Sequence, residues 1–312
     1  MDVSIIIVNY NTIGLTEQCI RSVIEHTKDL EYEIIVVDNA SGDDIEKDIP
    51  ALFSNSGCRI LCKKLKENVG FGRGNNEGFK MAQGKYLFCL NPDTILTNNA
   101  VKILRDFLEE HDDAGACGGN LFSRDMRPNH SFRRMLPGFK WELDLLLFGK
   151  IDKCLHGDDT EFNYSGKPLE VGYITGADLM MRRDVAKAVG GFSPDFFMYF
   201  EETDLCSKIR RTGYKIMSVP EAQIIHLEGG SFSDNNNATI NTKAIERSEA
   251  GRLTYYRLNA GRIRRWLLNA IYCTAICMNK TLFRLSGNEI WKYYEAKRIA
   301  YREAKLKENG RQ

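Results

Sequence analysis

The chain has 312 residues, of which 43% are hydrophobic and 27% are charged. These values are typical of globular proteins and exclude a disordered chain or a collagen-like repeat. The length allows a sizeable core, either in one larger α/β domain with an appendage or in two ordinary domains. The net charge is only +1, but residues 240–312 hold 16 Lys and Arg against 6 Asp and Glu, whereas the preceding residues hold 27 against 36. An acidic body is therefore joined to a basic tail.

The nine cysteines are scattered, mostly within apolar runs, with no C-x-x-C and no histidine pair at zinc-finger spacing. This pattern favours reduced, buried thiols in a cytosolic protein. The first residues, Met1-Asp2-Val3-Ser4, enter a strand-like run directly, without a basic segment or a cleavage site. We therefore expect no secretory signal.

Strand-like and helix-like segments alternate through the first 111 residues. The apolar, β-branched run Val3–Val8 is typical of a strand buried on both faces of a parallel sheet. The other predicted strands are Ile34–Val37, Arg59–Cys62 and Tyr86–Leu90, and the predicted helices are Leu15–His26, a polar helix after Gly42, Gly72–Gln83 and Asn98–His111. This alternation predicts a doubly wound α/β sheet with right-handed crossovers.

The pattern breaks down from Phe122 to Gly172, which predicts long loops. Beyond it we expect an ordered segment at Tyr173–Arg183, helices at Asp184–Val189 and Glu201–Thr212, and strands at Lys215–Val219 and Ala222–His226. The polar stretch Ser231–Asn237 is the best candidate for a linker. The sequence thus predicts a catalytic domain over residues 1–235 and a basic, helical extension over residues 236–312.

Polar clusters follow three of the predicted strands: Asn9-Tyr10-Asn11, Asp38-Asn39 and Asn91-Pro92-Asp93. One such cluster is readily explained as a helix cap or a turn, but three on one sheet edge indicate a shared ligand site, because open α/β sheets bind ligands there. A dinucleotide fold would place G-x-G-x-x-G after the first strand, and that position reads NYNTIG. The glycine-rich run Gly70–Gly78 comes too late, and a P-loop is absent.

Seven motifs in a fixed order resemble the family 2 glycosyltransferases of GT-A fold, most closely the rhamnosyltransferase-like branch that builds bacterial surface polysaccharides. In chain order they read VSIIIVNYNT, VVDNAS, ENVGFGRGNNEG, LNPDT, YITGADLMMRRD, FFMYFEETDLC and IIHLEGGSF. The resemblance implies an inverting, metal-dependent transferase that moves a sugar, with rhamnose a candidate, from a nucleotide-diphosphate donor to a saccharide or lipid-linked saccharide. Two alternatives stay open, namely transfer from a UDP-hexose or UDP-N-acetylhexosamine, and a non-catalytic scaffold that binds a nucleotide sugar.

The resemblance also implies a divalent cation, Mg²⁺ or Mn²⁺, because a diphosphate leaving group needs its charge neutralised. Asp93 matches the last acid of the family's D-x-D-like motif and is the expected metal ligand. Asn91 stands at the normally acidic first position, where it is able to bond a ribose hydroxyl but adds no charge. His226 matches the family's late metal-binding histidine.

By the same resemblance, Tyr10, followed by Asn11, stacks on the base of the donor. Asp38 accepts a hydrogen bond from a pyrimidine imide, a group that uracil and thymine share, so UDP and dTDP both remain possible; it also suits a turn. Asn68, Gly70 and Asn75 match the segment that lines the nucleotide pocket.

Inverting transfer needs one carboxylate to deprotonate the acceptor hydroxyl. The matched position is Glu202, a Glu where the family usually has Asp, and Glu201 and Asp204 are reserve candidates. Carboxylates at this position are also explained by the start of a helix. Gly176, Ala177 and Asp178 resemble the segment beside the transferred sugar, where Asp178 would hold a hydroxyl.

The basic tail contains the uncharged run Trp266–Asn279, flanked by arginines and lysines. It is too short to span a bilayer, so we expect a helix lying in the membrane interface, with Trp266, Tyr272, Trp291, Tyr293 and Tyr294 at the boundary. The alternative is a helical hairpin packed on the catalytic domain or on a second subunit, as in a homodimer. We expect no nucleic-acid binding, because no recognised module is present. A polyprenyl-diphosphate-linked acceptor would explain the tail and place the protein on the cytoplasmic face of the cell membrane. The cations expected to meet that diphosphate are Arg127, His130, Arg133 and Arg134.

Overall fold

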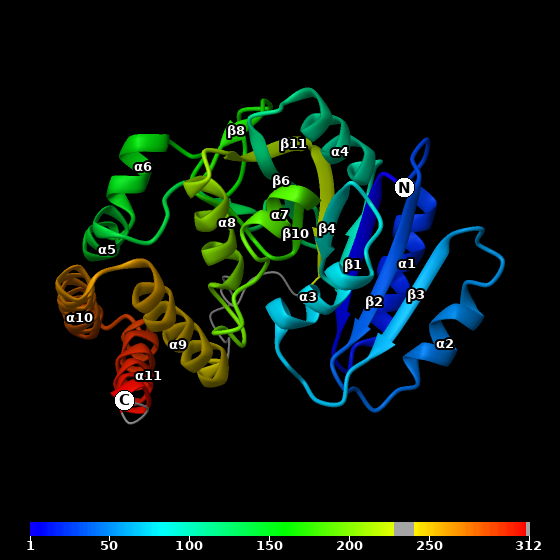
Figure 1. Ribbon diagram of the computed structural model, residues 1–312. Coiled ribbons are helices and arrows are strands. Elements are labelled where there is room, and N and C mark those ends of the chain that lie inside the picture. Colours follow the sequence, from blue (N-terminus) through cyan, green and yellow to red (C-terminus); the bar gives the residue numbers. More distant parts are fainter. Residues whose placement is uncertain (228–239, 310–312) are drawn as a thin grey trace. The chain divides into compact units, whose positions relative to one another are not determined.

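The computed structural model describes residues 1–227 and 240–309, which form two compact units (Figure 1). The first contains Met1–Arg134, Asp158–Pro194 and residues 202–227, and the second contains Met135–Gly157, Asp195–Glu201 and residues 240–309. The sequence predicts one boundary, at residue 235, whereas two earlier segments group here with the C-terminal helices. The predicted linker Ser231–Asn237 lies outside the described residues.

Within the described residues, the first unit is built on a nine-stranded sheet. Its order is β3-β2-β1-β4-β10-β6-β11-β5, and β8 pairs with β11. The strands are β1 (Val3–Asn9), β2 (Tyr32–Asp38), β3 (Arg59–Lys64), β4 (Tyr86–Leu90), β5 (Thr94–Leu96), β6 (Ala114–Phe122), β8 (Leu169–Glu170), β10 (Asp178–Arg182) and β11 (Lys215–His226). β1 is parallel to both of its neighbours, β2 and β4, so the chain reverses its direction across the sheet after β3. Ligands of such folds bind at this switch point, outside the carboxyl ends of the strands.

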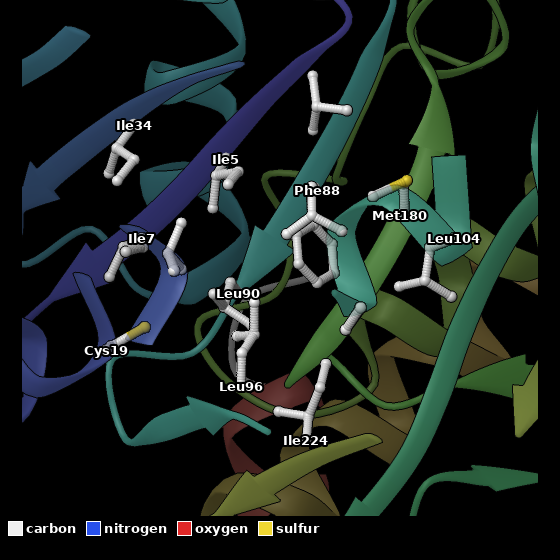
Figure 2. Packing of buried hydrophobic residues seen from close by; sticks show 14 of the residues in the cluster. Ile5, Ile7, Cys19, Ile34, Phe88, Leu90, Leu96, Leu104, Met180 and Ile224 are labelled. Atoms are coloured by element: carbon white, nitrogen blue, oxygen red, sulfur yellow. The ribbon is translucent and has the colours of Figure 1, made fainter. Parts of the chain in front are cut away.

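Helices of the first unit connect these strands and cover the sheet. They are α1 (Ile13–His26), α2 (Ile45–Leu52), α3 (Phe71–Met81), α4 (Ala100–Glu110), α7 (Arg183–Ala188) and α8 (Glu201–Arg211), of which the first residue, Glu201, groups with the second unit. Figure 2 shows part of the core, where Ile5 and Ile7 of β1 lie in one apolar layer with Phe88 and Leu90 of β4. All four side chains are at most 1% exposed. The strands and helices predicted over residues 3–111 are confirmed, with boundaries shifted by a few residues, because strands buried on both faces carry the strongest sequence signal.

The sequence prediction was wrong at several later elements. β6 was missed because three glycines dilute its apolar pattern, yet a Cβ at Gly119 would lie 2.4 Å from the Ala222 carbonyl oxygen, so the close approach needs glycine. β11 is one strand where two were expected, and its pairing with β6 shifts register between Lys215 and Ile216 and again between Ser218 and Gln223, the interval that holds Pro220. The predicted loop region contains two helices, α5 (Phe139–Leu146) and α6 (Lys150–His156), and the strand β7 (Phe132–Arg133), which pairs with β9 (Tyr173–Ile174) just beyond that region.

The second unit is helical. It contains α5 and α6 together with α9 (Thr242–Asn259), α10 (Arg262–Leu285) and α11 (Trp291–Asn309). Charged side chains lie in its interior: Arg252 and Glu142 are at most 4% exposed, with 3.3 Å between Arg252 Nη2 and Glu142 Oε1. Lys297 Nζ lies 3.5 Å from the buried Glu249 Oε1. This buried ionic cluster ties three helices, α5, α9 and α11, together.

The membrane-boundary role predicted for Tyr272 does not fit the structure. Tyr272 is 1% exposed and donates its hydroxyl proton to Glu249, whereas Trp266 is 67% exposed. Among the described helices, none combines the length and apolarity that a membrane crossing requires. Of the nine cysteines, Cys19, Cys89, Cys117 and Cys206 are buried, and Cys154 and Cys277 are exposed.

Candidate active site

The ends of β1 and β2 are joined by a network around Asp38. Asp38 is fully buried, and its Oδ1 accepts hydrogen bonds from Asn9 Nδ2 at 2.7 Å and from Ser41 Oγ at 2.5 Å. Its Oδ2 accepts from the Ser41 backbone N–H at 2.9 Å. The turn role that the sequence allowed for Asp38 is therefore present. A carboxylate has about four acceptor positions, so one is left unfilled, but because Asp38 is fully buried a ligand reaches it only if the surrounding turn opens.

The turn after β1 presents Tyr10 outward. Tyr10 is 49% exposed, and Asn11 has a positive φ of 55°. Asn9 holds this turn, because its Oδ1 accepts from the hydroxyls of Thr12 and Thr16, both at 2.9 Å. Sequence reasoning named Asn9 only as part of a polar cluster; its strand-end position directly opposite Asp38 gives it the central structural role.

The glycine-rich segment forms the start of α3. Gly70 precedes the helix with a φ of 89°, and Asn68 Oδ1 accepts from its N–H at 2.9 Å. Asn39 Nδ2 donates to the Gly70 carbonyl at 3.1 Å, which links the end of β2 to this loop. Asn75 is 1% exposed and donates to the Phe71 carbonyl, and its Oδ1 has no hydrogen-bond partner among the described residues. Asn75 therefore carries an acceptor that a ligand is able to satisfy.

Asp93 and His226 meet although 132 residues separate them along the chain. Asp93 follows β4 and precedes β5, and β5 pairs with the end of β11 so that His226 lies opposite Thr94. Asp93 Oδ1 lies 3.3 Å from His226 Nε2, and the Asn91 amide nitrogen lies 3.4 Å from the same ring nitrogen. The His226 and Asp93 side chains are 17% and 13% exposed, so both retain access to solvent.

This pair fits two ligands of one divalent cation. Two adjacent ligands of an octahedral ion, each about 2.1 Å from it, are about 3 Å apart, close to the separation of these two atoms. The described residues contain no group of three or more His, Cys, Asp and Glu side chains able to hold a metal.

Backbone strain precedes the carboxylates of α8. Tyr199 and Phe200 both have a φ of 71°, a conformation that costs non-glycine residues energy and often occurs at functional sites. Glu202 is half-buried, and its carboxylate accepts a hydrogen bond from Thr203 Oγ1 at 3.2 Å. Burial raises the pKa of the Glu202 carboxyl, against hydrogen bonds that lower it. A carboxyl with a raised pKa is a stronger base once ionised.

The two reserve candidates are less open. Glu201 is 4% exposed and Asp204 is 3% exposed. Asp204 Oδ2 pairs with Lys208 Nζ at 3.3 Å, and that ammonium also donates to the Gly191 carbonyl. Asp204 therefore has a structural role in α8 that Glu202 lacks.

The segment Gly176-Ala177-Asp178 lies beside β4, but its acid points inward. The Asn91 N–H donates to the Ala177 carbonyl at 2.9 Å, which places this segment next to the D-x-D-like motif. Asp178 is fully buried and its Oδ2 accepts from the Gly119 N–H at 2.6 Å. Burial raises the pKa of the Asp178 carboxyl well above its ordinary value. The sugar-hydroxyl role expected of Asp178 needs an open side chain, which this conformation does not offer.

The loop cations of the first unit differ in their surroundings. Arg127 pairs with Asp125 at 2.7 Å and Arg133 pairs with Glu161 at 2.5 Å. Burial, together with the positive charge of Arg133, lowers the pKa of His130 to about 3, so its imidazole is neutral. His130 Nε2 has no hydrogen-bond partner among the described residues. Burial raises the pKa of Tyr173, on which the charges of Arg133 and Glu202 both act, so these two groups lie within electrostatic range of one ring.

Comparisons with known proteins agree with this geometry. A profile of the family described as glycosyl transferase family 2 matches residues 4–190, more than half of the chain. The chain belongs to glycosyl transferase family 2. The matched range includes Asp38, Asn75 and Asp93, and the family resemblance seen in the sequence is confirmed.

Sequence relatives are modest in identity. An uncharacterised protein of Sinorhizobium fredii is 26% identical over 240 residues, which are 73% of this chain and 25% of that protein. An uncharacterised protein of Mycobacterium tuberculosis is 28% identical over 202 residues, 62% of this chain and 58% of that one. The rhamnosyltransferase WbbL of Escherichia coli is 26% identical over 190 residues, 56% of this chain and 66% of its own. The chain thus spans between a quarter and two thirds of the length of these relatives.

Solved structures show the fold. The mannosyltransferase PcManGT of Pyrobaculum calidifontis, in complex with GDP-Man and Mn²⁺, has a TM-score of 0.60 at 12% identity and covers 98% of this chain and 86% of its own. The structure of S. aureus TarS residues 1–349 in complex with UDP-GlcNAc has a TM-score of 0.54 at 16% identity, and the match covers 100% of this chain and 93% of the TarS chain. The structure of GalNAc-T7 with UDP, GalNAc and Mn²⁺ has a TM-score of 0.59 at 15% identity, and the match covers 82% of this chain and 48% of the GalNAc-T7 chain. The fold is therefore GT-A, with helices following it.

Proposed function

We propose that this protein transfers a sugar from a nucleotide-diphosphate donor to a hydroxyl of a saccharide acceptor, with inversion. The observation that carries the proposal is the 3.3 Å approach of Asp93 Oδ1 and His226 Nε2 at the switch point of a family 2 fold. The donor base would bind over the ends of β1 and β2, between Tyr10 with Asn11 on one side and Asp38 on the other. Asn68, Gly70 and Asn75 would line the same pocket.

The donor is a UDP-sugar or a dTDP-sugar, with rhamnose as the favoured unit. Relatives named as rhamnosyltransferases support rhamnose, including the N-acetylglucosaminyl-diphospho-decaprenol L-rhamnosyltransferase of Mycobacterium tuberculosis, which is 38% identical over 56 residues, 18% of this chain and 18% of its own. TarS bound to UDP-GlcNAc supports the alternative of a UDP-N-acetylhexosamine or UDP-hexose. The scaffold alternative is disfavoured, because Asp38, Asp93 and Glu202 are all acids.

Asp93 and His226 would hold a Mg²⁺ or Mn²⁺ ion, and Asn91 would bond a ribose hydroxyl. When bound, the cation supplies positive charge that stabilises the departing diphosphate. Structures of PcManGT and GalNAc-T7 contain Mn²⁺, which supports the use of a cation of this kind here. The protein's own part is to fix the two ligands at the end of β4 and β11 before the donor arrives.

Glu202 would take the proton of the acceptor hydroxyl as it attacks the anomeric carbon. Its raised pKa and its position at the start of α8 suit a general base. Glu201 and Asp204 remain reserve candidates, and Asp204 is the weaker of these because Lys208 neutralises it. Gly176, Ala177 and Asp178 would lie beside the transferred sugar, although Asp178 would need to turn outward to touch it.

The acceptor is proposed to be a saccharide, free or linked to polyprenyl diphosphate, at the cytoplasmic face of the cell membrane. Arg134 of the loop region would approach that diphosphate, whereas His130, whose imidazole is neutral, would add no positive charge there. Residues 1–235 would form the catalytic domain, and the basic helices beyond would contact the membrane surface; packing on a second subunit in a homodimer is the alternative.

Calorimetric titration with UDP and dTDP, each with and without Mn²⁺, tests the donor site. We expect metal-dependent binding of one nucleotide, reduced at least tenfold by Asp93→Ala and left unchanged by the matched exposed-acid variant Glu110→Gln. Glu202→Gln should retain nucleotide binding and lose sugar transfer by about 10²–10⁴-fold, the usual contribution of a general base. Full transfer by Glu202→Gln would assign the base elsewhere, and unaltered Mn²⁺ dependence in Asp93→Ala would remove the metal assignment.

A further inference from the structure

The outer face of α10 in the second unit is exposed and uncharged along most of the helix. Ile263 is 79% exposed, Trp266 is 67% exposed and Leu285 is 80% exposed. Between residues 266 and 282, every exposed side chain of α10 is uncharged. These side chains are Trp266, Leu267, Ala270, Thr274, Cys277, Thr281 and Leu282. Ile263, Trp266, Ala270, Thr274, Cys277, Thr281 and Leu285 follow one another at three or four residues and so form one row about 33 Å long, and Leu267 and Leu282 lie beside it.

The hydroxyl groups within this stripe do not need water. Thr274 Oγ1 donates to the Ala270 carbonyl at 2.9 Å, and Thr281 Oγ1 donates to the Cys277 carbonyl at 2.8 Å. Because both hydroxyl protons are already bonded to the helix backbone, removing water from these threonines costs little. A shallow open groove of about 600 Å³ lies on the same stripe, lined by Cys273, Thr274, Cys277, Met278, Thr281 and Leu282.

Packing of the second unit does not explain the stripe. The side of α10 that faces the other helices buries a separate set of residues, Leu268, Tyr272, Ala275, Ile276 and Asn279. Exposed apolar surface of this extent usually marks a contact with a partner or a membrane. The charges that border the stripe indicate which kind of partner it fits.

Both ends of α10 are cationic. The helix holds five basic residues and no acid, namely Arg262, Arg264 and Arg265 at its start and Lys280 and Arg284 near its end. Arg265 pairs with Glu308 and Lys280 with Glu295, whereas the other three form no ion pair with a described residue. Arg264 and Arg284 lie over the rings of Phe139 and Trp291, at 6.0 and 5.5 Å from the ring centres. Three unpaired guanidinium groups thus border the apolar stripe.

These charges favour a lipid surface over a second copy of the chain. In a symmetric dimer through α10, the cationic end of one helix would face a cationic end of the other, whichever way the helices run. An anionic bilayer instead accepts an apolar stripe into its interface while phosphate groups pair with the arginines at both ends.

We propose that α10 lies flat on an anionic membrane, with Ile263, Trp266, Leu282 and Leu285 inserted among the lipids and Arg262, Arg264 and Arg284 at the phosphate groups. The proposal names the face of α10 that meets the membrane. It rests on the proposed function only in the reason for membrane binding, namely that a lipid-linked acceptor would lie at the same membrane surface. The vesicle binding itself does not depend on the sugar transferred.

Co-sedimentation of the full chain with vesicles tests this face. We expect binding to vesicles of phosphatidylglycerol and phosphatidylcholine, and at least tenfold weaker binding to phosphatidylcholine alone. Trp266→Glu and Leu282→Glu should each weaken binding at least tenfold, while Leu306→Glu should leave it unchanged, although Leu306 of α11 is 68% exposed. Arg264→Gln and Arg284→Gln should each weaken binding to the anionic vesicles about fivefold. Equal loss in Leu306→Glu, or no preference for phosphatidylglycerol, would overturn the proposal.

Trp266 also serves as a direct probe. With Trp141→Phe and Trp291→Phe, it is the sole tryptophan of the chain. We expect its emission to shift to the blue on anionic vesicles and to be quenched by brominated lipid. Unchanged emission, or a dimer in sedimentation equilibrium that Trp266→Glu dissociates, would refute the lipid assignment. Titration of Trp266→Glu with the nucleotide that the wild type binds should give wild-type affinity, which shows the variant is folded. Vesicle binding by a wild type that binds no nucleotide would count against the proposed function alone.

Discussion

Adding one methyl group to α3 should destabilise the protein and disturb its nucleotide site. Gly74 and Gly78 lie one turn apart on α3 and face β1. A Cβ at Gly78 would lie 2.5 Å from Ile6 Cγ2 and 3.1 Å from Ile6 Cγ1, whereas ordinary contacts begin at 3.4 Å. Ile6 is fully buried, and its β-branched side chain has few alternative rotamers. Gly78→Ala therefore requires a shift of α3 or β1 by close to an ångström.

The magnitude follows from two opposing effects. Overpacking a buried contact costs about 1–3 kcal/mol, and replacing glycine by alanine within a helix gains about 1 kcal/mol. Since the clash is severe and Ile6 is unable to yield, we expect a net loss of about 1–2 kcal/mol for Gly78→Ala. The matched control is Gly14→Ala in α1, where a Cβ would meet nothing within 4 Å. It should stabilise by up to about 1 kcal/mol.

Urea denaturation at equilibrium measures both changes, and titration with the donor nucleotide measures the effect on the site, because Asn75 and the start of α3 move with Gly78. Combining Gly78→Ala with Ile6→Ala should recover at least about 0.5 kcal/mol relative to the sum of the single effects, since the second change removes both Cγ atoms. Strict additivity, or a Gly78→Ala protein as stable as Gly14→Ala, would refute the close-packing argument.

Three further predictions concern buried charge. The raised pKa of Asp178 means that its ionisation opposes folding, so the stability of the wild type falls as pH rises above the ordinary carboxyl range. In urea denaturation between pH 5 and pH 8, the stability of Asp178→Asn relative to the wild type should therefore increase with pH, by about 1.4 kcal/mol for each unit of the pKa shift titrated in that window. A stability difference that does not change with pH would contradict this. Arg252→Met should cost about 3–5 kcal/mol in denaturant unfolding, because it leaves Glu142 buried without its cation, and adding Glu142→Gln should recover part of the loss; a cost under 1 kcal/mol would exclude this account. On the acid side of its pH profile, kcat should fall as pH drops through the raised pKa of Glu202. Thr203→Val removes a hydrogen bond that lowers this pKa, so it should shift the fall in kcat to higher pH. If Thr203→Val leaves the profile unchanged, the group that titrates is not Glu202.

The sequence by itself determined the order of strands and helices over residues 3–111, except for the short strand β5 (Thr94–Leu96), which it did not predict. Strands such as Val3–Asn9 are buried on both faces, so apart from Ser4 their residues are apolar up to the strand end, and the polar residues that follow are brought to one edge by the sheet topology. The motif around Asp93 and the family of the chain followed from the same local patterns. Where packing rather than pattern decided the structure, as in the glycine-containing β6 or in α5 and α6 within the expected loops, the sequence reading failed.

Tertiary structure alone decided which of these residues meet. Asp93 and His226 come within 3.3 Å only because β5 and β11 pair at one end of the sheet, a long-range contact that spacing along the chain does not encode. Asp178 turns toward the Gly119 N–H, which no local rule predicts. Tyr272 and Trp266 belong to the same uncharged run, yet one is buried against Glu249 and the other lies in the outer stripe of α10. The sequence shows that both side chains are largely apolar, but which face of the helix is buried depends on the elements that pack against it.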